Sequence, residues 1–397
     1  METPDRLAIK LKTVAEKNIR HGHPWVFSDS ITKQSKPGKS GDLAIIFDHK
    51  TEKVIAIGLY DAKSPVRIKI IHHGGSAKID EQFFLDKMTQ AMEIRKPLLA
   101  NHTNAYRLLF GENDGFPGLI LDIYADKGVL KIYSEAWFSY IKLLIPSIVK
   151  LTGVSSIIIR MSRLLQNASK IYHEGDFIYG KNDDANVIFE EYGVRFQADL
   201  IHGHKTGFFL DHRQNRHHIG ELSKGKTVLD VFSYAGGFSI HALANGASEV
   251  TSVDFSEQAL ELAKQNAALN PHSGKYETLP GDAFVILAEL IRRKKKYDVV
   301  VIDPPSFAKS ENETAVALKK YAELAELGVK LTKKGGILLL CSCSSRVSKE
   351  QFFHVHETTF NRLGIGYELL EKTTHDIDHP VTFLEGSYLK SAYYRIF

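Results

Sequence analysis

Residues 228–239 read Val-Leu-Asp-Val-Phe-Ser-Tyr-Ala-Gly-Gly-Phe-Ser, and this stretch decides the fold class. The apolar run 227–232 leads into a glycine-bearing turn and a helical pattern, as expected for a buried parallel strand followed by a crossover helix. Glycines let backbone amides approach a ligand closely, and the start of a helix favours negative charge. Asp254 ends the next apolar run, at a spacing from Asp230 that suits an acid bound to ribose hydroxyls. We therefore expect a nucleotide-like ligand at this edge of the sheet.

The same alternation of strand and helix continues toward the C-terminus. Near-continuous apolar runs at 250–254, 299–303 and 337–341 predict further buried parallel strands. Helical patterns lie between the strands, at 256–270, 283–293 and 313–331. Residues 189–397 are therefore predicted to form a doubly wound α/β domain of the Rossmann-like type.

The first part of the chain has a different pattern. Short apolar runs at 43–47 and 54–59 are separated by turn signals, which favours a small β-barrel over residues 1–75. The stretch 72–76, His-His-Gly-Gly-Ser, is interpreted as a linker.

A middle α+β domain is expected over residues 76–188. A helix is predicted from 80 to about 100, followed by a dense turn cluster at 111–118. Apolar runs at 129–133 and 156–160 predict further strands.

Composition narrows the functional classes. The 397 residues carry a net charge of +4, which permits nucleic-acid binding without demanding it. Lysines 33, 36 and 39 and the run 292–296 concentrate basic charge, although such runs are about as often simply solvated surface. Two cysteines exclude a disulfide framework, and the chain has no apolar stretch that could span a bilayer. We expect a cytoplasmic protein without a membrane partner.

Candidate chemical groups stand at the ends of the predicted strands. Asp303-Pro304-Pro305-Ser306-Phe307 places a carboxylate before a rigid turn, where ligands of α/β sheets bind, although an ordinary strand-ending turn is the alternative. Asp282 follows the third strand and suits contact with an adenine. Asp254 and Asp282 could instead cap the helices that follow them.

The two cysteines close the fifth strand. Cys341 and Cys343 are two residues apart and so face the same way, with Cys343 nearer the loop. We expect Cys343 to be reactive and Cys341 to be an inert buried residue.

Two other patterns do not carry a function. Residues 220–227 match the P-loop letter for letter, but the match precedes a strand instead of following one. Histidines 202, 204, 212, 217 and 218 cluster without the spacing of a known metal site, so no metal is expected.

Together these residues resemble a known family. The chain is similar to the bacterial and archaeal large-subunit ribosomal RNA cytosine-C5 methyltransferases that carry an N-terminal PUA domain, over nearly its whole length. The stretches that carry the resemblance are His23-Pro24-Trp25-Val26-Phe27-Ser28, Gly111-Glu112-Asn113-Asp114-Gly115-Phe116-Pro117-Gly118-Leu119, Lys205-Thr206-Gly207-Phe208-Phe209-Leu210-Asp211 with Arg213, Asn215 and Arg216, the glycine turn, Asp303-Pro304-Pro305-Ser306-Phe307, and Ser342-Cys343-Ser344.

The resemblance implies a fold, a cofactor and a site. The fold is a PUA-like barrel, a middle domain and a class I methyltransferase domain with a mostly parallel seven-stranded sheet. The cofactor is S-adenosylmethionine, the substrate is large-subunit ribosomal RNA, and Cys343 is the nucleophile with Asp303 beside it. The residues implied to bind the cofactor are Thr206, Phe208, Asp230, Ser233, Gly236, Asp254, Asp282 and Asp303. Tyr234 stands where many methyltransferases have glycine, and Ser306 stands where related enzymes have a second cysteine, so the release step is open.

Other functions stay open at this point. The Asp303-Pro304-Pro305 motif also resembles that of enzymes that methylate an exocyclic or ring nitrogen and need no cysteine. A non-catalytic RNA-binding or ribosome-assembly factor could keep the same fold. The sequence also leaves open a homodimer, the target nucleotide and the base that removes the C5 proton.

Overall fold

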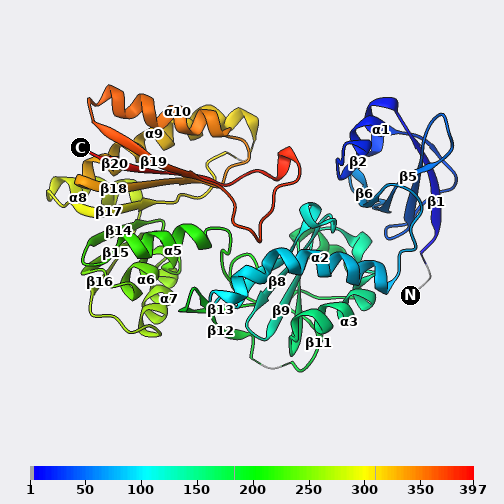
Figure 1. The fold of residues 1–397 in the computed structure, drawn as a ribbon, viewed down its shortest axis with the longest axis horizontal. Coiled ribbons are helices and arrows are strands. Elements are labelled where there is room, and N and C mark those ends of the chain that lie inside the picture. Colours follow the sequence, from blue (N-terminus) through cyan, green and yellow to red (C-terminus); the bar gives the residue numbers. More distant parts are fainter. Residues whose placement is uncertain (1–3, 183, 309) are drawn as a thin grey trace. The chain divides into compact units, whose positions relative to one another are not determined.

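The computed structural model describes residues 4–182, 184–308 and 310–397, so the first three residues of the predicted N-terminal domain lie outside the description. The chain separates into two compact units (Figure 1). The first unit comprises Met1–Phe189, Ala198–Leu210 and Ile377–Gly386, and the second comprises Glu190–Gln197, Asp211–Asp376 and Ser387–Phe397.

A six-stranded sheet begins the first unit. Its order is β2 (Trp25–Phe27), β6 (Val66–His73), β5 (Val54–Tyr60), β4 (Leu43–Phe47), β1 (Arg6–Leu11) and β3 (Ile31–Gln34), with helix α1 (Thr13–Arg20) beside it. Alternate residues of β1 point inward, so that Leu7, Ile9 and Leu11 are buried. The predicted linker is wrong for His72 and His73, because strand β6 continues through both residues and pairs them with Ile57 and Ala56.

A five-stranded sheet and two helices complete the first unit. The strand order is β11 (Phe177–Tyr179), β10 (Ser156–Met161), β9 (Lys127–Ile132), β8 (Leu119–Tyr124) and β7 (Ala105–Phe110), with α2 (Glu81–Ala100) and α3 (Ile141–Thr152) packed together. Helix α2 begins where the sequence predicts, because Asp80 accepts a hydrogen bond from the Phe83 amide at 3.1 Å. Fully buried aromatic side chains such as Phe84, Phe116 and Trp137 fill the core.

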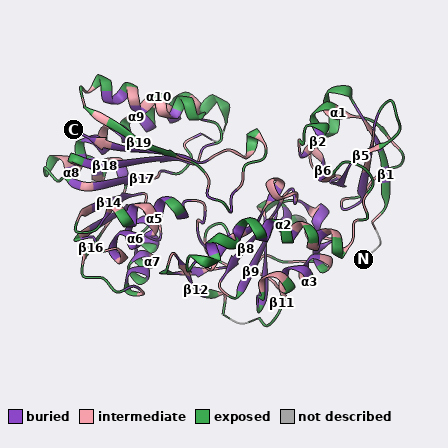
Figure 2. Ribbon diagram, viewed as in Figure 1, coloured by how far each residue is buried: buried purple, intermediate pink, exposed green. Residues whose placement is uncertain are grey.

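The second unit holds a seven-stranded, mostly parallel sheet, as expected from the sequence. The order is β16 (Lys275–Pro280), β15 (Glu249–Asp254), β14 (Thr227–Val231), β17 (Tyr297–Ile302), β18 (Thr332–Ser342), β20 (Lys390–Ile396) and β19 (Tyr367–Thr373). Strand β20 runs antiparallel to both of its neighbours. The central strands are buried along most of their length (Figure 2).

Helices cover both faces of this sheet (Figure 1). One set is α5 (Arg213–Leu222), α6 (Gly237–Ala244) and α7 (Glu257–Ala268), and the other is α8 (Ala283–Arg292), α9 (Thr314–Leu331) and α10 (Lys349–Arg362). The parallel strands β14, β15, β16 and β17 therefore end at one common edge, where their loops gather. None of the helices in the described part of the chain has the length and apolarity needed to cross a membrane.

Candidate active site

The turn after β14 has a strained backbone. Phe232 and Tyr234 adopt φ angles of 64° and 48°, and Gly236 has φ 78°. Non-glycine residues in this left-handed region cost of order 1–3 kcal/mol each and persist only where the surroundings hold them. The Ser233 amide donates to the Val253 carbonyl at 3.0 Å, and the Tyr234 amide donates to Asp254 Oδ2 at 2.8 Å. The neighbouring strand therefore fixes the turn in a shape that helix and strand preferences alone would not produce.

This turn fits a bound polar ligand. Asp230 Oδ1 and Ser233 Oγ are buried and have no hydrogen-bond partner among the described residues. Such orphaned oxygens are costly unless a ligand or water satisfies them. A Cβ atom on Gly236 would approach Ala263 Cβ to 3.0 Å, so only glycine lets the turn pack this closely on α7. The residues present therefore fit a nucleoside cofactor with several hydrogen-bonding groups.

Asp230, near the end of β14, holds the turn through hydrogen bonds to the start of α6. Its Oδ2 accepts hydrogen bonds from the Ser239 amide at 3.0 Å and the Ser239 hydroxyl at 2.7 Å, which ties β14 to the first turn of α6. Burial raises the pKa of Asp230 to about 7, and the nearby charges of Asp303 and Asp254 add to the rise, while the Ser239 hydrogen bonds oppose it.

Asp282 and Asp254, the two candidate ligand-binding acids, make different hydrogen bonds within the protein. Asp282 caps α8 by accepting from the Val285 amide at 3.2 Å, as the alternative interpretation anticipated. Asp254 is not a cap, because Ser256 caps α7, but Asp254 Oδ1 accepts from the Ser256 amide at 2.9 Å. A carboxylate oxygen has two lone pairs, so these bonds still leave each side chain able to accept from a ligand.

The structure brings Cys343 and the Asp303-Pro304-Pro305 turn together. Strands β17 and β18 are paired neighbours, with Ile302 opposite Leu340. The partly exposed Cys343 thiol donates to the Pro304 carbonyl, with an Sγ–O distance of 3.7 Å. The thiol therefore contacts the residue that directly follows Asp303.

Cys341 is placed differently. It is 1% exposed, and burial, followed by repulsion from Asp303, raises the pKa of its thiol well above the ordinary value. A thiol held in its neutral form is a poor nucleophile, so the structure provides a physical reason to prefer Cys343.

Asp303 also faces a histidine that the sequence places only in a cluster without metal-site spacing. His212 is buried, and its Nε2 lies 3.4 Å from Asp303 Oδ1, although neither atom has a hydrogen-bond partner among the described residues. Burial lowers the pKa of His212, but the Asp303 charge outweighs it, and the net shift is upward. Asn215 Nδ2 lies 3.0 Å from His212 Nδ1, and as the amide is placed it donates to that nitrogen. The ring proton is then on Nε2, within ion-pair distance of Asp303.

One cluster has the spacing of a metal site but not its chemistry. Ligand atoms of His212, Asp303 and Cys341 all lie within 4.8 Å of one another. A metal ion would need a free lone pair on His212 Nε2, but the Asn215 contact at Nδ1 leaves the ring proton on Nε2. The ion would also need the Cys341 thiolate, which burial disfavours.

Thr206 and Phe208 lie in the first unit, where both make internal contacts. The Thr206 hydroxyl donates to Asp122 Oδ2 at 2.6 Å, and the Phe208 amide donates to the Tyr124 hydroxyl at 3.1 Å. The Phe208 ring is 4% exposed and packs edge-on against Phe189. A role of these two residues in cofactor binding stays a prediction.

Sequence analysis missed one further charged group beside Cys343. Lys390 is 2% exposed and begins strand β20, opposite Ser342. The available signal was a lysine two residues before the short run Ala392-Tyr393-Tyr394, close to a segment that reads as a buried strand.

Comparison with known proteins agrees with this architecture. Residues 132–380 match the family model of S-adenosylmethionine-dependent methyltransferases, and residues 9–73 match a PUA-like domain. A ribosomal RNA large subunit methyltransferase of Deinococcus radiodurans is 39% identical, with 98% of each chain aligned. Ribosomal RNA large subunit methyltransferase I of Aeromonas salmonicida is 34% identical over 96% of this chain and 97% of its own.

Solved structures show the same fold. A Streptococcus mutans protein described as a SAM-dependent methyltransferase superposes with a TM-score of 0.80 at 21% identity, covering 98% of this chain and 99% of its own. A methyltransferase solved in complex with SAH gives a TM-score of 0.81, also at 21% identity, over 98% of this chain and 100% of its own. With a PUA-like domain before a class I fold and relatives aligned from end to end, this chain belongs to the S-adenosylmethionine-dependent methyltransferase family that includes the ribosomal RNA large subunit methyltransferases.

Proposed function

We propose that this protein methylates C5 of a cytosine in large-subunit ribosomal RNA through a covalent bond between Cys343 and C6 of the base. The observation that carries the proposal is the partly exposed Cys343 thiol, 3.7 Å from the Pro304 carbonyl and next to Asp303. The names of the relatives supply the class of RNA. We further propose three domains, over residues 1–75, 76–188 and 189–397.

The chemistry needs a nucleophile because C5 of cytosine is itself unreactive. Addition of the Cys343 thiolate to C6 gives an enamine-like ring whose C5 can attack an electrophilic methyl group. S-adenosylmethionine supplies that methyl group on a sulfonium. Loss of the C5 proton then reverses the addition, breaks the C6–S bond and regenerates the thiolate. The base must be unpaired or flipped out for Cys343 to reach it.

We propose that Asp303 stabilises the negative charge that develops on the cytosine ring. Its carboxyl group is 22% exposed, and we propose that it shares a proton with N3 of the cytosine as C6 is attacked. His212, just before α5, lies within ion-pair distance of this carboxyl group.

The cofactor residues are proposed from the glycine turn and the neighbouring strand ends. Asp254 would accept from the ribose hydroxyls and Asp282 would contact the adenine, while the orphaned Ser233 hydroxyl and the close-packed Gly236 line the turn. Asp230 shapes this turn, Asp303 closes the pocket on the substrate side, and Thr206 and Phe208 cover the cofactor.

The test replaces each cysteine by serine. Cys343→Ser should abolish methyl transfer to ribosomal RNA from cells that lack the protein, because a hydroxyl is a far weaker nucleophile than a thiolate. Binding of cofactor and RNA should persist. Cys341→Ser is the matched control and should retain most activity, since Cys341 is buried and its thiol is neutral.

Trapping the adduct identifies the atom that attacks. RNA with 5-fluorocytosine at the target should become covalently attached to the wild-type enzyme, because fluorine cannot leave as a cation. Mass spectrometry should find the RNA on the peptide that contains Cys343. Full activity of Cys343→Ser would instead favour methylation of a nitrogen, and attachment at Cys341 would move the nucleophile by two residues.

A further inference from the structure

Lys390 is a buried lysine at the reactive edge of the sheet. It is 2% exposed, and its Nζ donates to the carbonyls of Ser344 at 2.5 Å, Val347 at 2.6 Å and Tyr388 at 3.3 Å. Among the described residues, no carboxylate forms an ion pair with it. Lysine is almost never fully buried without a paired charge, so the placement of this ammonium group calls for an explanation.

Two of the three acceptors of Lys390, Ser344 and Val347, belong to the loop that follows Cys343. Ser344 is the next residue in the chain, and Val347 ends the same turn before helix α10. Antiparallel pairing of β18 with β20 sets Lys390 opposite Ser342, so the backbone fixes the root of the lysine beside the end of the cysteine strand. A rigid positive charge is therefore held next to Cys343.

We propose that Lys390 is a positioning residue for Cys343, which fixes the loop that carries the thiol and favours its ionised form by charge. This inference rests on the proposed function, in which the Cys343 thiolate attacks C6. It supplies the cation that a nucleophilic thiol requires. A free thiol is only about 3% ionised at pH 7, and lowering its pKa by one unit raises that fraction to about 24%.

Charged and titratable groups from several elements lie around Lys390 and Cys343, and Arg346 is a second, exposed cation on the loop after Cys343. The charge of Asp303, next to the Pro304 carbonyl that accepts from the thiol, opposes ionisation of the thiol, while Tyr321 of α9 and Cys341 of β18 stay neutral because burial raises the pKa of each. Lys349 and Glu350, at the start of α10, carry opposite charges and act on Lys390 in opposite directions.

The interaction of the two groups works in both directions. Burial lowers the pKa of Lys390 to about 8, and the charge of an ionised Cys343 is the largest influence that raises it. Lys390 therefore remains mostly an ammonium group at pH 7. Because the coupling between two sites is reciprocal, the same ammonium stabilises the thiolate.

The experiment measures the ionisation of Cys343 directly, in full-length protein without RNA or cofactor. A Cys341→Ser background leaves Cys343 as the one thiol of the chain. The rate of alkylation by iodoacetamide is followed against pH by mass spectrometry of the Cys343 peptide. The wild-type side chain at position 390 should give a thiol pKa below the reference of about 8.5.

Three substitutions separate charge from structure. Lys390→Met and Lys390→Gln remove the charge and should raise the alkylation pKa by about one unit. Lys390→Arg keeps the charge and should stay close to the parent protein. If Lys390 had a purely structural role, the alkylation pKa of the three variants would depend on how well each side chain packs at position 390. It would not depend on whether that side chain carries a charge. Circular dichroism checks that each variant is folded.

Two results would overturn the inference. One is an unchanged alkylation pKa in a folded Lys390→Met or Lys390→Gln variant. The other is a pKa at or above about 8.5 in the parent protein, which decides the matter even if the neutral variants fail to fold. Either result would leave the Cys343 adduct standing, whereas full methylation by Cys343→Ser would remove the adduct without altering the alkylation profile.

Discussion

At the scale of the residue, Asp254 is the side chain that joins the two strand ends of the cofactor edge. It accepts hydrogen bonds from the amides of Tyr234 and Ser256, at 2.8 and 2.9 Å. It thereby holds the left-handed Tyr234 in place. In the proposed site the same carboxylate would also accept from the ribose hydroxyls of the cofactor.

Asp254→Ala should weaken binding of S-adenosylmethionine by about 1–3 kcal/mol, or roughly 5- to 150-fold, because the ribose hydroxyls lose an acceptor and the strained turn loses its support. Isothermal titration calorimetry measures the affinity. Glu257→Ala is the matched control, since Glu257 is an exposed acid on the first turn of α7. Equal affinities of the Asp254→Ala variant and the parent protein would remove Asp254 from the site.

The sequence could name residues whose position follows from the end of a strand. Asp254, Asp303 and Cys343 each stand where an apolar run stops, so periodicity alone places them at the carboxyl edge. Periodicity cannot place His212 and Lys390, because they reach Asp303 and the Cys343 loop from distant segments. Their contacts depend on side-chain direction and on the pairing of β20 with β18, which no local pattern encodes.

At the scale of the element, the sequence predicts some helices closely and does not predict others. Helices α2, α7, α8 and α9 lie within a few residues of the predicted bounds, and each buries apolar side chains. Helix α5 has the opposite pattern, since it buries Arg213, Asn215 and Arg216. Helix α6 is apolar nearly all round and only eight residues long, so it has no amphipathic period. Strand β19 was missed because it is mostly exposed.

The polar face of α5 is held by a buried acid on a neighbouring hairpin. Glu191 ends β12 (Asn186–Glu191), accepts two hydrogen bonds from Arg216 at 2.7 and 2.6 Å, and lies 2.9 Å from His241 of α6. All three side chains are buried. Burial alone would raise the pKa of Glu191, but the Arg216 charge outweighs it and holds the pKa well below its usual range.

Glu191→Gln should lower the free energy of unfolding by about 3–5 kcal/mol at pH 7, because it removes the carboxylate that accepts two hydrogen bonds from the buried Arg216 guanidinium. Folding depresses the pKa of Glu191, so its stabilisation is complete above the unfolded value of about 4.3 and is lost as the pH falls through the folded value. The difference between parent and variant should therefore shrink below about pH 4. Urea unfolding at several pH values measures the free energy of unfolding of the parent protein and the variant.

Glu190→Gln, on a partly exposed side chain, is the control and should change the free energy of unfolding by less than about 1 kcal/mol. A difference that grows as the pH falls would show that another group dominates.

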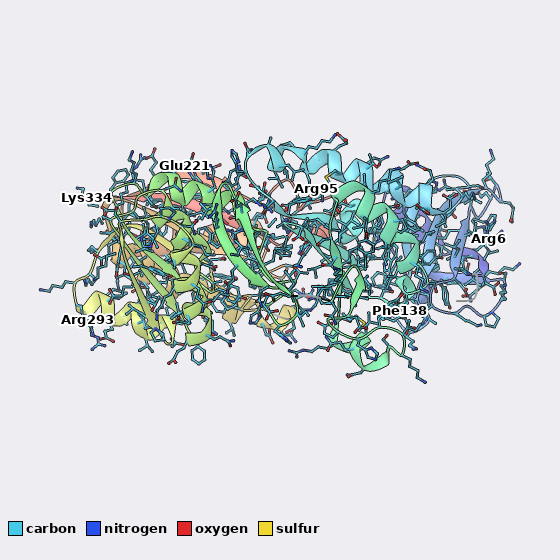
Figure 3. The ribbon with its side chains drawn as sticks, turned by 90° about the horizontal axis from the view of Figure 1, so that it is seen from below. Arg6, Arg95, Phe138, Glu221, Arg293 and Lys334 are labelled. Atoms are coloured by element: carbon cyan, nitrogen blue, oxygen red, sulfur yellow. The ribbon has the colours of Figure 1, made fainter. Side chains whose placement is uncertain are left out.

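At the scale of the whole molecule, basic charge is carried by both units. Lys33, Lys36 and Lys39 belong to the PUA-like domain in the first unit, whereas Arg292, Arg293 and Lys294 end helix α8 in the second. Arg293 projects from its unit in Figure 3 and is 66% exposed. We expect the first set to contribute RNA affinity, because the PUA-like domain lies outside the unit that carries Cys343.

Removal of the whole PUA-like domain would be an unclear test of that expectation. Leu43, Ile57, Leu59 and Ile71 of this domain share one apolar core with Trp137, which lies later in the first unit. Deletion of residues 1–75 would expose that core and alter the rest of the unit. Neutralising surface charge leaves the core intact and isolates the electrostatic contribution.

The triple variant Lys33→Gln, Lys36→Gln, Lys39→Gln should weaken RNA binding most at low salt and flatten its salt dependence. Each phosphate contact contributes about 0.7 to the slope of log affinity against log salt for single strands, so three lost contacts should reduce the slope by about 2. Lys36 forms an exposed ion pair with Asp5, which is too weak to keep it from a phosphate. Filter binding to a ribosomal RNA fragment across a salt series measures the slope.

The control is Arg292→Gln, Arg293→Gln, Lys294→Gln, which removes the same net charge from the second unit. If both triples flatten the slope equally, the effect is one of net charge, and the N-terminal domain has no special part in binding RNA. If only the N-terminal triple does so, while cofactor affinity stays constant, the RNA backbone is bound by the PUA-like domain.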